Sequence, residues 1–157
     1  MMQRMPSQSR CATPDPVHRC WQRRKKRYAL RVMIDLATNQ TEEPIRLKDV
    51  ADRQGISVKY LEQIISALTK AGYLTSLRGS SGGYQLKKKP EEYTVGMILR
   101  ATEGSLAPVS CVEDKDNPCE RIDSCVTARV WKKINDAVND VVDGITLQDL
   151  VDWQRGE

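Results

Sequence analysis

Two short amphipathic segments joined by Gly55-Ile56-Ser57 constrain the fold more than any other feature of the sequence. The first segment covers residues 47–54. The second covers residues 58–71 and carries apolar residues at helical spacing: Leu61, Ile64, Ile65 and Leu68. Glycine suits the left-handed residue that follows a helix, and serine is a good N-cap for the next helix. Two helices joined by so short a turn predict a helix-turn-helix.

A β-hairpin is predicted directly after the second helix. Residues 73–77 and 84–87 are short and strand-like, and a glycine- and serine-rich turn separates them. A hairpin in this position is the wing of a winged helix. Thr94 then caps a further helix over residues 95–103.

The long helix predicted after residue 125 carries a narrow apolar stripe. Val130, Ile134, Ala137 and Val141 recur at intervals of 4, 3 and 4, a spacing typical of a seam with a partner helix. We therefore predict a homodimer with these four residues at its interface.

The predicted fold is mostly α with a small β-hairpin wing, and it divides the chain into four parts. We expect a basic, disordered arm over residues 1–26 and a winged helix-turn-helix domain over 27–104. A cysteine loop follows over 105–125, and a dimerisation helix with a C-terminal tail covers 126–157.

The net charge of +4 conceals a partition along the chain. Residues 1–27 sum to +7, residues 28–90 to +4 and residues 91–157 to −7. The basic part favours contact with a polyanion, so we expect double-stranded DNA as a partner. No apolar run is long enough to span a bilayer and no secretory signal is evident, so we expect a cytoplasmic protein without membrane contact. With a single histidine, His18, and no phosphate loop before a helix, we expect no enzymatic activity.

The candidate DNA contacts lie on the helix-turn-helix and on the wing. In this arrangement the N-terminal half of the second helix enters the major groove. Glu62 and Gln63 could read bases there, and Arg78 with Gly79 could approach a minor groove. The candidates expected to contact phosphates are Lys48, Ser57, Lys59 and Tyr60.

Three cysteines, Cys111, Cys119 and Cys125, lie within 15 residues of one another. Their separations of seven and five residues differ from the two-residue gaps of zinc knuckles and bacterial ferredoxins. Thiolates suit an iron–sulfur cluster, zinc or copper(I). The chain has an odd total of five cysteines, which disfavours a disulfide framework. Cys125 precedes a helix, whose positive dipole end favours a thiolate.

Several of these segments resemble the Rrf2 family of winged-helix transcription regulators. The resemblance covers residues 27–151. It is carried by Arg27-Tyr28-Ala29-Leu30-Arg31, Gly55-Ile56-Ser57, Tyr60-Leu61-Glu62-Gln63, Arg78-Gly79, Gly82-Gly83-Tyr84 and Leu106-Ala107-Pro108-Val109. It implies a homodimeric, DNA-binding regulator whose C-terminal helices form the dimer interface.

The cysteine spacing resembles the cluster-binding branch of this family, with its IscR-, NsrR- and RirA-like members. That resemblance implies a [2Fe-2S] or [4Fe-4S] cluster on Cys111, Cys119 and Cys125 that senses iron, redox state or nitric oxide. IscR-type members use a histidine three residues after the last cysteine, where this chain has Ala128. NsrR-type members can use an acidic residue where this chain has Arg27.

The fourth ligand therefore stays open. Its candidates are a small exogenous thiol and the side chains of His18, Glu113, Asp114, Asp116 and Glu120. Two other functions also stay open. One is a cluster-free, CymR-like regulator or adaptor that binds a metabolic enzyme, and the other is a zinc-stabilised winged-helix regulator.

Overall fold

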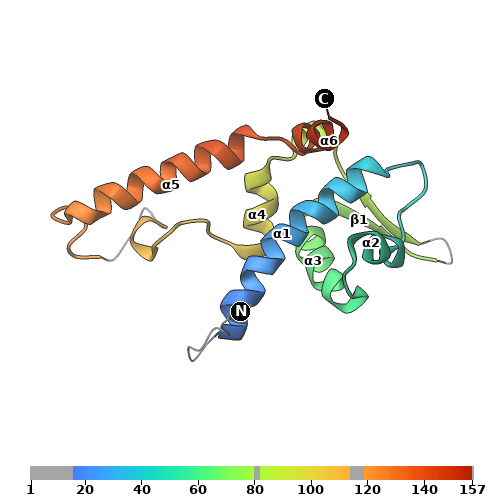
Figure 1. Cartoon of the computed structure of the whole chain (residues 1–157), viewed down its shortest axis with the longest axis horizontal. Coiled ribbons are helices and arrows are strands. Elements are labelled where there is room, and N and C mark those ends of the chain that lie inside the picture. Colours follow the sequence, from blue (N-terminus) through green and yellow to red (C-terminus); the bar gives the residue numbers. More distant parts are fainter. Residues whose placement is uncertain (1–15, 80–81, 114–118, 157) are drawn as a thin grey trace, which may run out of the picture.

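The computed structural model describes residues 16–79, 82–113 and 119–156, with the side chains of the first helix described from Lys25 onward. These residues form six α-helices, two short 3-10 helices and one antiparallel strand pair (Figure 1). In chain order the elements are α1 (Pro16–Thr38), α2 (Leu47–Gln54), α3 (Val58–Lys70), β1 (Leu74–Leu77), β2 (Gly83–Leu86), η1 (Pro90–Glu92), α4 (Val95–Glu103), η2 (Ser110–Val112), α5 (Val126–Gly144) and α6 (Leu147–Arg155). The mostly α fold with a hairpin wing is confirmed.

The core forms where the apolar stripes of α1 and α3 meet α4 and α6. From α3 it buries Leu61, Ile64, Ile65 and Leu68, each at most 2% exposed. Burying one such side chain contributes about 1.5–3 kcal/mol. Tyr93 is fully buried in this core, and its hydroxyl donates to the Tyr73 carbonyl at 2.9 Å.

The turn between α2 and α3 has the predicted geometry. Gly55 has φ 63°, and the Ile56 N–H donates to the Ala51 carbonyl at 3.1 Å, which ends α2. Ser57 then caps α3, its hydroxyl accepting from the Tyr60 N–H at 3.3 Å. These contacts set the direction in which α3 leaves the turn.

The wing is held to the helices by its base. Strand β1 pairs with β2 in antiparallel register from Leu74↔Leu86 to Leu77↔Gly83. Ile45, in the connection before α2, bridges to Tyr84 through backbone hydrogen bonds of 2.8 and 3.0 Å. A Cβ at Gly83 would overlap the Ile45 backbone, so the close approach requires glycine.

The start of α1 differs from the prediction. We expected a disordered arm over residues 1–26, whereas the chain is helical from Pro16. Proline is well tolerated in the first helical turn, and arginine and lysine are good helix formers, so this segment needs no apolar stripe to be helical. Residues 1–15 lie outside the described residues.

Helix α5 extends away from the winged-helix body and joins it at its C-terminal end, next to α4 and α6 (Figure 1). The other end of α5 lies beside η2. Along the described residues, no helix is both long and apolar enough to cross a membrane.

Candidate functional site

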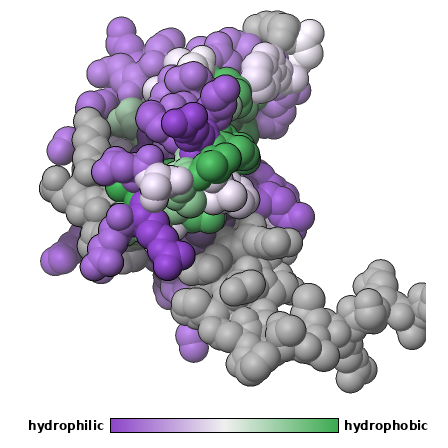
Figure 2. Space-filling view, turned by 90° about the vertical axis from the view of Figure 1, so that its left-hand side faces the viewer, coloured by the Kyte–Doolittle hydropathy of each residue, from purple (hydrophilic) through white to green (hydrophobic). Residues whose placement is uncertain are grey.

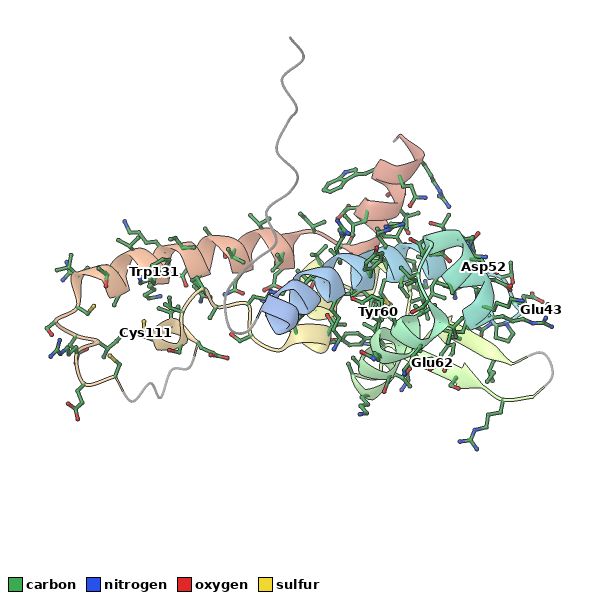
Figure 3. All side chains as sticks on the ribbon, turned by 60° about the horizontal axis from the view of Figure 1, so that its bottom comes forward. Glu43, Asp52, Tyr60, Glu62, Cys111 and Trp131 are labelled. Carbon is green, nitrogen blue, oxygen red and sulfur yellow. The ribbon has the colours of Figure 1, made fainter. Side chains whose placement is uncertain are left out.

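Most of the predicted DNA contacts are accessible. Ser57, Lys59, Glu62 and Gln63 are exposed on the first turns of α3, and Lys48 is exposed on α2. Figure 3 shows Glu62 on the outer side of α3. Arg78 and Gly79, which follow β1 at the wing, are also exposed, and Gly79 has φ 120°. Their roles as DNA contacts stay predictions.

Tyr60 differs from its neighbours on α3. Its side chain is half-buried and its ring packs edge-on against Tyr28 of α1, with ring centroids 5.7 Å apart and an interplanar angle of 86°. The hydroxyl oxygen is buried. The guanidinium groups of Arg27 and Arg31 each lie 5.3 Å from the Tyr28 ring centroid. Tyr60 therefore positions α3 against α1, and the phosphate contact predicted for it would require the ring to leave this packing.

Sequence reasoning missed a polar clamp between α1 and α2. The Asp35 carboxylate accepts from Arg53 Nη2 at 2.6 Å, from Arg53 Nε at 3.0 Å and from Gln54 Nε2 at 2.8 Å. Gln54 Oε1 in turn accepts from Arg31 Nε at 2.9 Å. The hydrogen bonds that Arg53 donates to Asp35 raise the pKa of Arg53. The clamp holds the end of α2 immediately before the turn into α3. A signal for it was present, because Asp35 stands between apolar residues on the buried side of α1.

The three cysteines occupy different environments around the start of α5. Cys111 is half-buried in η2, Cys119 is exposed, and Cys125 is half-buried as the N-cap of α5. Sγ of Cys125 lies 3.1 Å from Oγ1 of Thr127. This hydrogen bond lowers the pKa of Cys125, and backbone N–H groups at the helix start and the charge of Arg121 act in the same direction. Cys125 is therefore disposed toward its thiolate, the form that binds metals.

A cavity of about 440 Å³ lies between η2 and the first turns of α5. Cys111 and Ile122 line it, together with Ala128 on the α5 side. Cys125 caps the same helix one turn before Ala128, and Cys119 begins the turn that carries Ile122. Cys111 thus lines the cavity, whereas Cys119 and Cys125 lie in the segments that adjoin its lining. Thiolates are ligands that suit an iron–sulfur cluster, zinc or copper(I).

In the part of the chain that the structure describes, however, no three His, Cys, Asp or Glu side chains converge as metal ligands. Of the open candidates for a fourth ligand, Glu113 lines the cavity. Asp114 and Asp116 fall outside the described residues, as does the side chain of His18. Figure 3 shows Cys111 beside the N-terminal half of α5, at the opposite end of the molecule from the wing.

The predicted interface residues of α5 lie on its outer surface. Val130, Ile134 and Val141 are 55%, 40% and 60% exposed, and Ala137 is also exposed. Val126, at 77%, extends this apolar surface toward the thiols. Figure 2, which faces the end of the molecule where α5 begins, shows hydrophobic surface bordered by hydrophilic residues. A contiguous exposed patch of this kind is typical of a protein interface.

The family model for Rrf2, described as an iron-dependent transcriptional regulator, matches residues 23–153. The chain belongs to the Rrf2 family. Its relatives include protein rrf2 of Nitratidesulfovibrio vulgaris, 44% identical over 81% of this chain and 84% of that protein. The regulator IscR of Aliivibrio salmonicida is 40% identical over 81% of this chain and 74% of its own length.

A solved structure of CymR, the global cysteine regulator of B. subtilis, has a TM-score of 0.66. It is 41% identical, over 82% of this chain and 94% of that one. The Rrf2-family relatives IscR and CymR are named as transcriptional regulators, in agreement with the predicted non-enzymatic role. They match this chain at nearly equal identity, so the cysteines of this chain itself must distinguish the two kinds of regulator.

Proposed function

We propose that this Rrf2-family regulator is a homodimer that binds operator DNA and senses iron, redox state or nitric oxide through an iron–sulfur cluster. The observation that carries the proposal is that Cys111 lines the cavity at the start of α5, while Cys125 is the N-cap of that helix and Cys119 begins the turn that precedes it. The cluster resemblance of the cysteine spacing and the family's description as iron-dependent support it.

DNA recognition in this proposal follows from the accessible face of α3. Glu62 and Gln63 read base edges in the major groove, and Lys59 contacts phosphate. Arg78 contacts the adjacent minor groove from the wing. The clamp around Asp35 keeps the end of α2 in place, so that α3 enters the groove at a defined angle.

The cluster would be held by the three thiolates, and when bound it supplies a centre that oxygen, nitric oxide or iron scarcity can destroy. The protein's own contribution is mechanical. Ligation by Cys111 and Cys125 would tie η2 to the first turn of α5, and ligation by Cys119 would hold the turn between them. The cluster-bound and cluster-free forms would then hold α5 differently and so differ in operator affinity.

The homodimer is expected to form along the exposed apolar face of α5. Burial of Val130, Ile134 and Val141 against a second copy removes apolar surface from water at about 25 cal/mol per Å². The same contact would place two winged helix-turn-helix domains on one duplex, as two-fold symmetric operators require.

The deciding experiment is anaerobic purification followed by metal analysis and visible absorption. We expect a coloured protein with thiolate-to-iron absorption, whose colour is lost in Cys111→Ala together with a change in operator affinity. Cys111→Ala protein with unchanged cofactor content and DNA affinity would refute the proposal. Ser110→Ala, which alters the neighbouring residue of η2, is the matched control.

Two alternatives give different results in the same experiment. A colourless protein with one zinc per chain would indicate a zinc-stabilised regulator. A colourless protein without metal that binds DNA would indicate a cluster-free regulator or adaptor of the CymR kind. The similarity to CymR and the lack of convergent ligands among the described residues favour this second alternative over zinc.

A further inference from the structure

Arg100 of α4 makes a forked contact with α5. Its Nη1 donates to Asp143 Oδ1 at 2.6 Å, and its Nη2 donates to Asp143 Oδ2 at 2.8 Å and to Asn139 Oδ1 at 2.6 Å. Asn139 and Asp143 lie four residues apart, on the same face of α5. The planar guanidinium therefore binds side chains at two positions of α5 at once. This two-point contact restrains both the distance between α4 and α5 and the direction of α5. We call these three residues the α4–α5 clamp.

The backbone around the clamp is fitted to it. Gly96 lies one turn before Arg100 on α4 and is buried. A Cβ at Gly96 would overlap the Asp143 carboxylate and Arg100 Nη1, so the forked contact occupies the space that glycine leaves on α4. The contact also raises the pKa of Arg100 and lowers that of Asp143, as expected when both groups keep their charges in the pair.

A backbone strap fixes the end of α5 next to the clamp. The Val95 N–H donates to the Ile145 carbonyl at 2.9 Å, and the Leu147 N–H donates to the Tyr93 carbonyl at 2.8 Å. These bonds join the start of α4 to the connection between α5 and α6. The strap holds one point of α5 to the body, and the clamp adds the second point that determines the direction of the helix.

The rest of α5 projects from the body (Figure 1). From Asn139 to Cys125 the helix spans about 21 Å at 1.5 Å per residue. A tilt of about 10° at the clamp would move one end relative to the other by about 3.7 Å. That displacement is comparable with the rise of roughly 3.4 Å per base pair. A tilt of this size is therefore large enough to matter for the spacing of operator half-sites.

We propose that Arg100, acting through Asn139 and Asp143, is a specificity-determining positioning residue that sets which spacing of operator half-sites the protein accepts. The inference rests on the proposed homodimer. If α5 forms the interface between two copies, the α4–α5 clamp determines how each DNA-binding domain is oriented relative to that interface.

The test uses the full-length protein and a duplex that the wild type selects from a random-sequence pool. Affinity is measured for that duplex and for versions with one base pair added or removed at the centre, and a random duplex reports non-specific binding. The variants are Arg100→Lys, Asp143→Asn and Gly96→Ala, the last of which disturbs the clamp without changing a charge. Asp140→Asn, an exposed carboxylate on the same helix, is the charge-matched control.

For the wild type we expect a loss on the order of tenfold when the spacing changes by one base pair. The clamp variants should bind the selected spacing about fivefold more weakly, and their penalty for a changed spacing should fall below about threefold. Non-specific affinity, sedimentation as a dimer and the Asp140→Asn profile should match the wild type.

An unchanged spacing penalty in the clamp variants would overturn this inference alone. An equal loss of affinity at every half-site spacing would also overturn it, because a residue that only stabilises the fold would weaken binding to all of these duplexes alike. A monomeric wild-type protein would overturn the homodimer itself, and the spacing inference with it.

Discussion

Replacing Arg53 by methionine should cost more stability than replacing Asp35 by asparagine, although both changes break the same ion pair. The Asp35 side chain is 3% exposed and that of Arg53 is 38% exposed. Arg53→Met leaves a buried carboxylate with only the Gln54 amide as a partner at 2.8 Å. Asp35→Asn leaves a guanidinium that can turn to water.

The magnitudes follow from that asymmetry. Removing one partner of a buried pair costs about 3–5 kcal/mol when a charge is left uncompensated, and partial exposure of Arg53 places Arg53→Met at about 3 kcal/mol. Losing charged hydrogen bonds without burying a charge costs about 1.5 kcal/mol, the value expected for Asp35→Asn. For a chain of this size the melting temperatures should fall by about 6–12 °C and about 3–6 °C respectively.

The assay is urea unfolding at pH 7 and one fixed protein concentration, because the proposed dimerisation would make stability depend on concentration. The double variant is the decisive control: it removes both charges, so it should be more stable than Arg53→Met alone. The reasoning is refuted if Arg53→Met costs no more than Asp35→Asn, or if the costs of the two changes simply add in the double variant.

Three further predictions concern the wing and the α4–α5 contact. Gly83→Ala should destabilise the protein by about 2 kcal/mol or more, because the new methyl group would meet the Ile45 backbone; chemical unfolding measures this, and an unchanged midpoint would contradict it. Arg78→Ala should make the fall of log affinity with log salt less steep by about one unit of slope, because a cation in the minor groove displaces a counterion; DNA titration across salt concentrations measures this, and an unchanged slope would exclude contact between this charge and the DNA. Asp143 has its pKa lowered by Arg100, so its contribution to stability should be complete above the unfolded-state pKa of about 3.9 and be lost as the pH falls below it. The stability difference between wild type and Asp143→Asn, followed by urea unfolding from pH 7 to pH 3, should therefore shrink toward acid pH, and a constant difference would argue against the pair.

The turn into α3 and the wing could be predicted because their signals are local. Gly55 is needed for the left-handed backbone at the end of α2, and Ser57 for the free N–H groups at the start of α3. The wing is indicated by two short strand-like runs and by the glycine- and serine-rich turn between them. Each of these signals lies within a few positions of the chain, so no tertiary information is needed to recognise it.

The positions of Asp35 and Tyr60 could not be read in this way. A carboxylate on an otherwise apolar helix face gives no indication of its partner, and Arg53 lies 18 residues away on another helix. Tyr60 follows Lys59, which is exposed, yet it turns inward to meet Tyr28. Both outcomes depend on how α1, α2 and α3 pack against one another. The spacing of apolar residues along a single helix does not reveal that packing. For the same reason the cysteine spacing predicts a shared site but not the fourth ligand.

In the proposed function α5 connects two equilibria, because Cys125 caps its first turn, Cys111 lies in η2 beside that end, and the α4–α5 clamp holds its other end. Coupling between ligand binding at two sites is reciprocal. If ligation at Cys125 changes operator affinity by some factor, operator binding must change the affinity for the ligated centre by the same factor. The coupling can act only through states of α5 that differ at both ends. Helix α5 can have two such states when the α4–α5 clamp is made in one and loosened in the other, while the backbone strap keeps the helix attached to the body in both. The cysteines and Arg100 therefore act at opposite ends of the same helix, and a change in the position of α5 couples them.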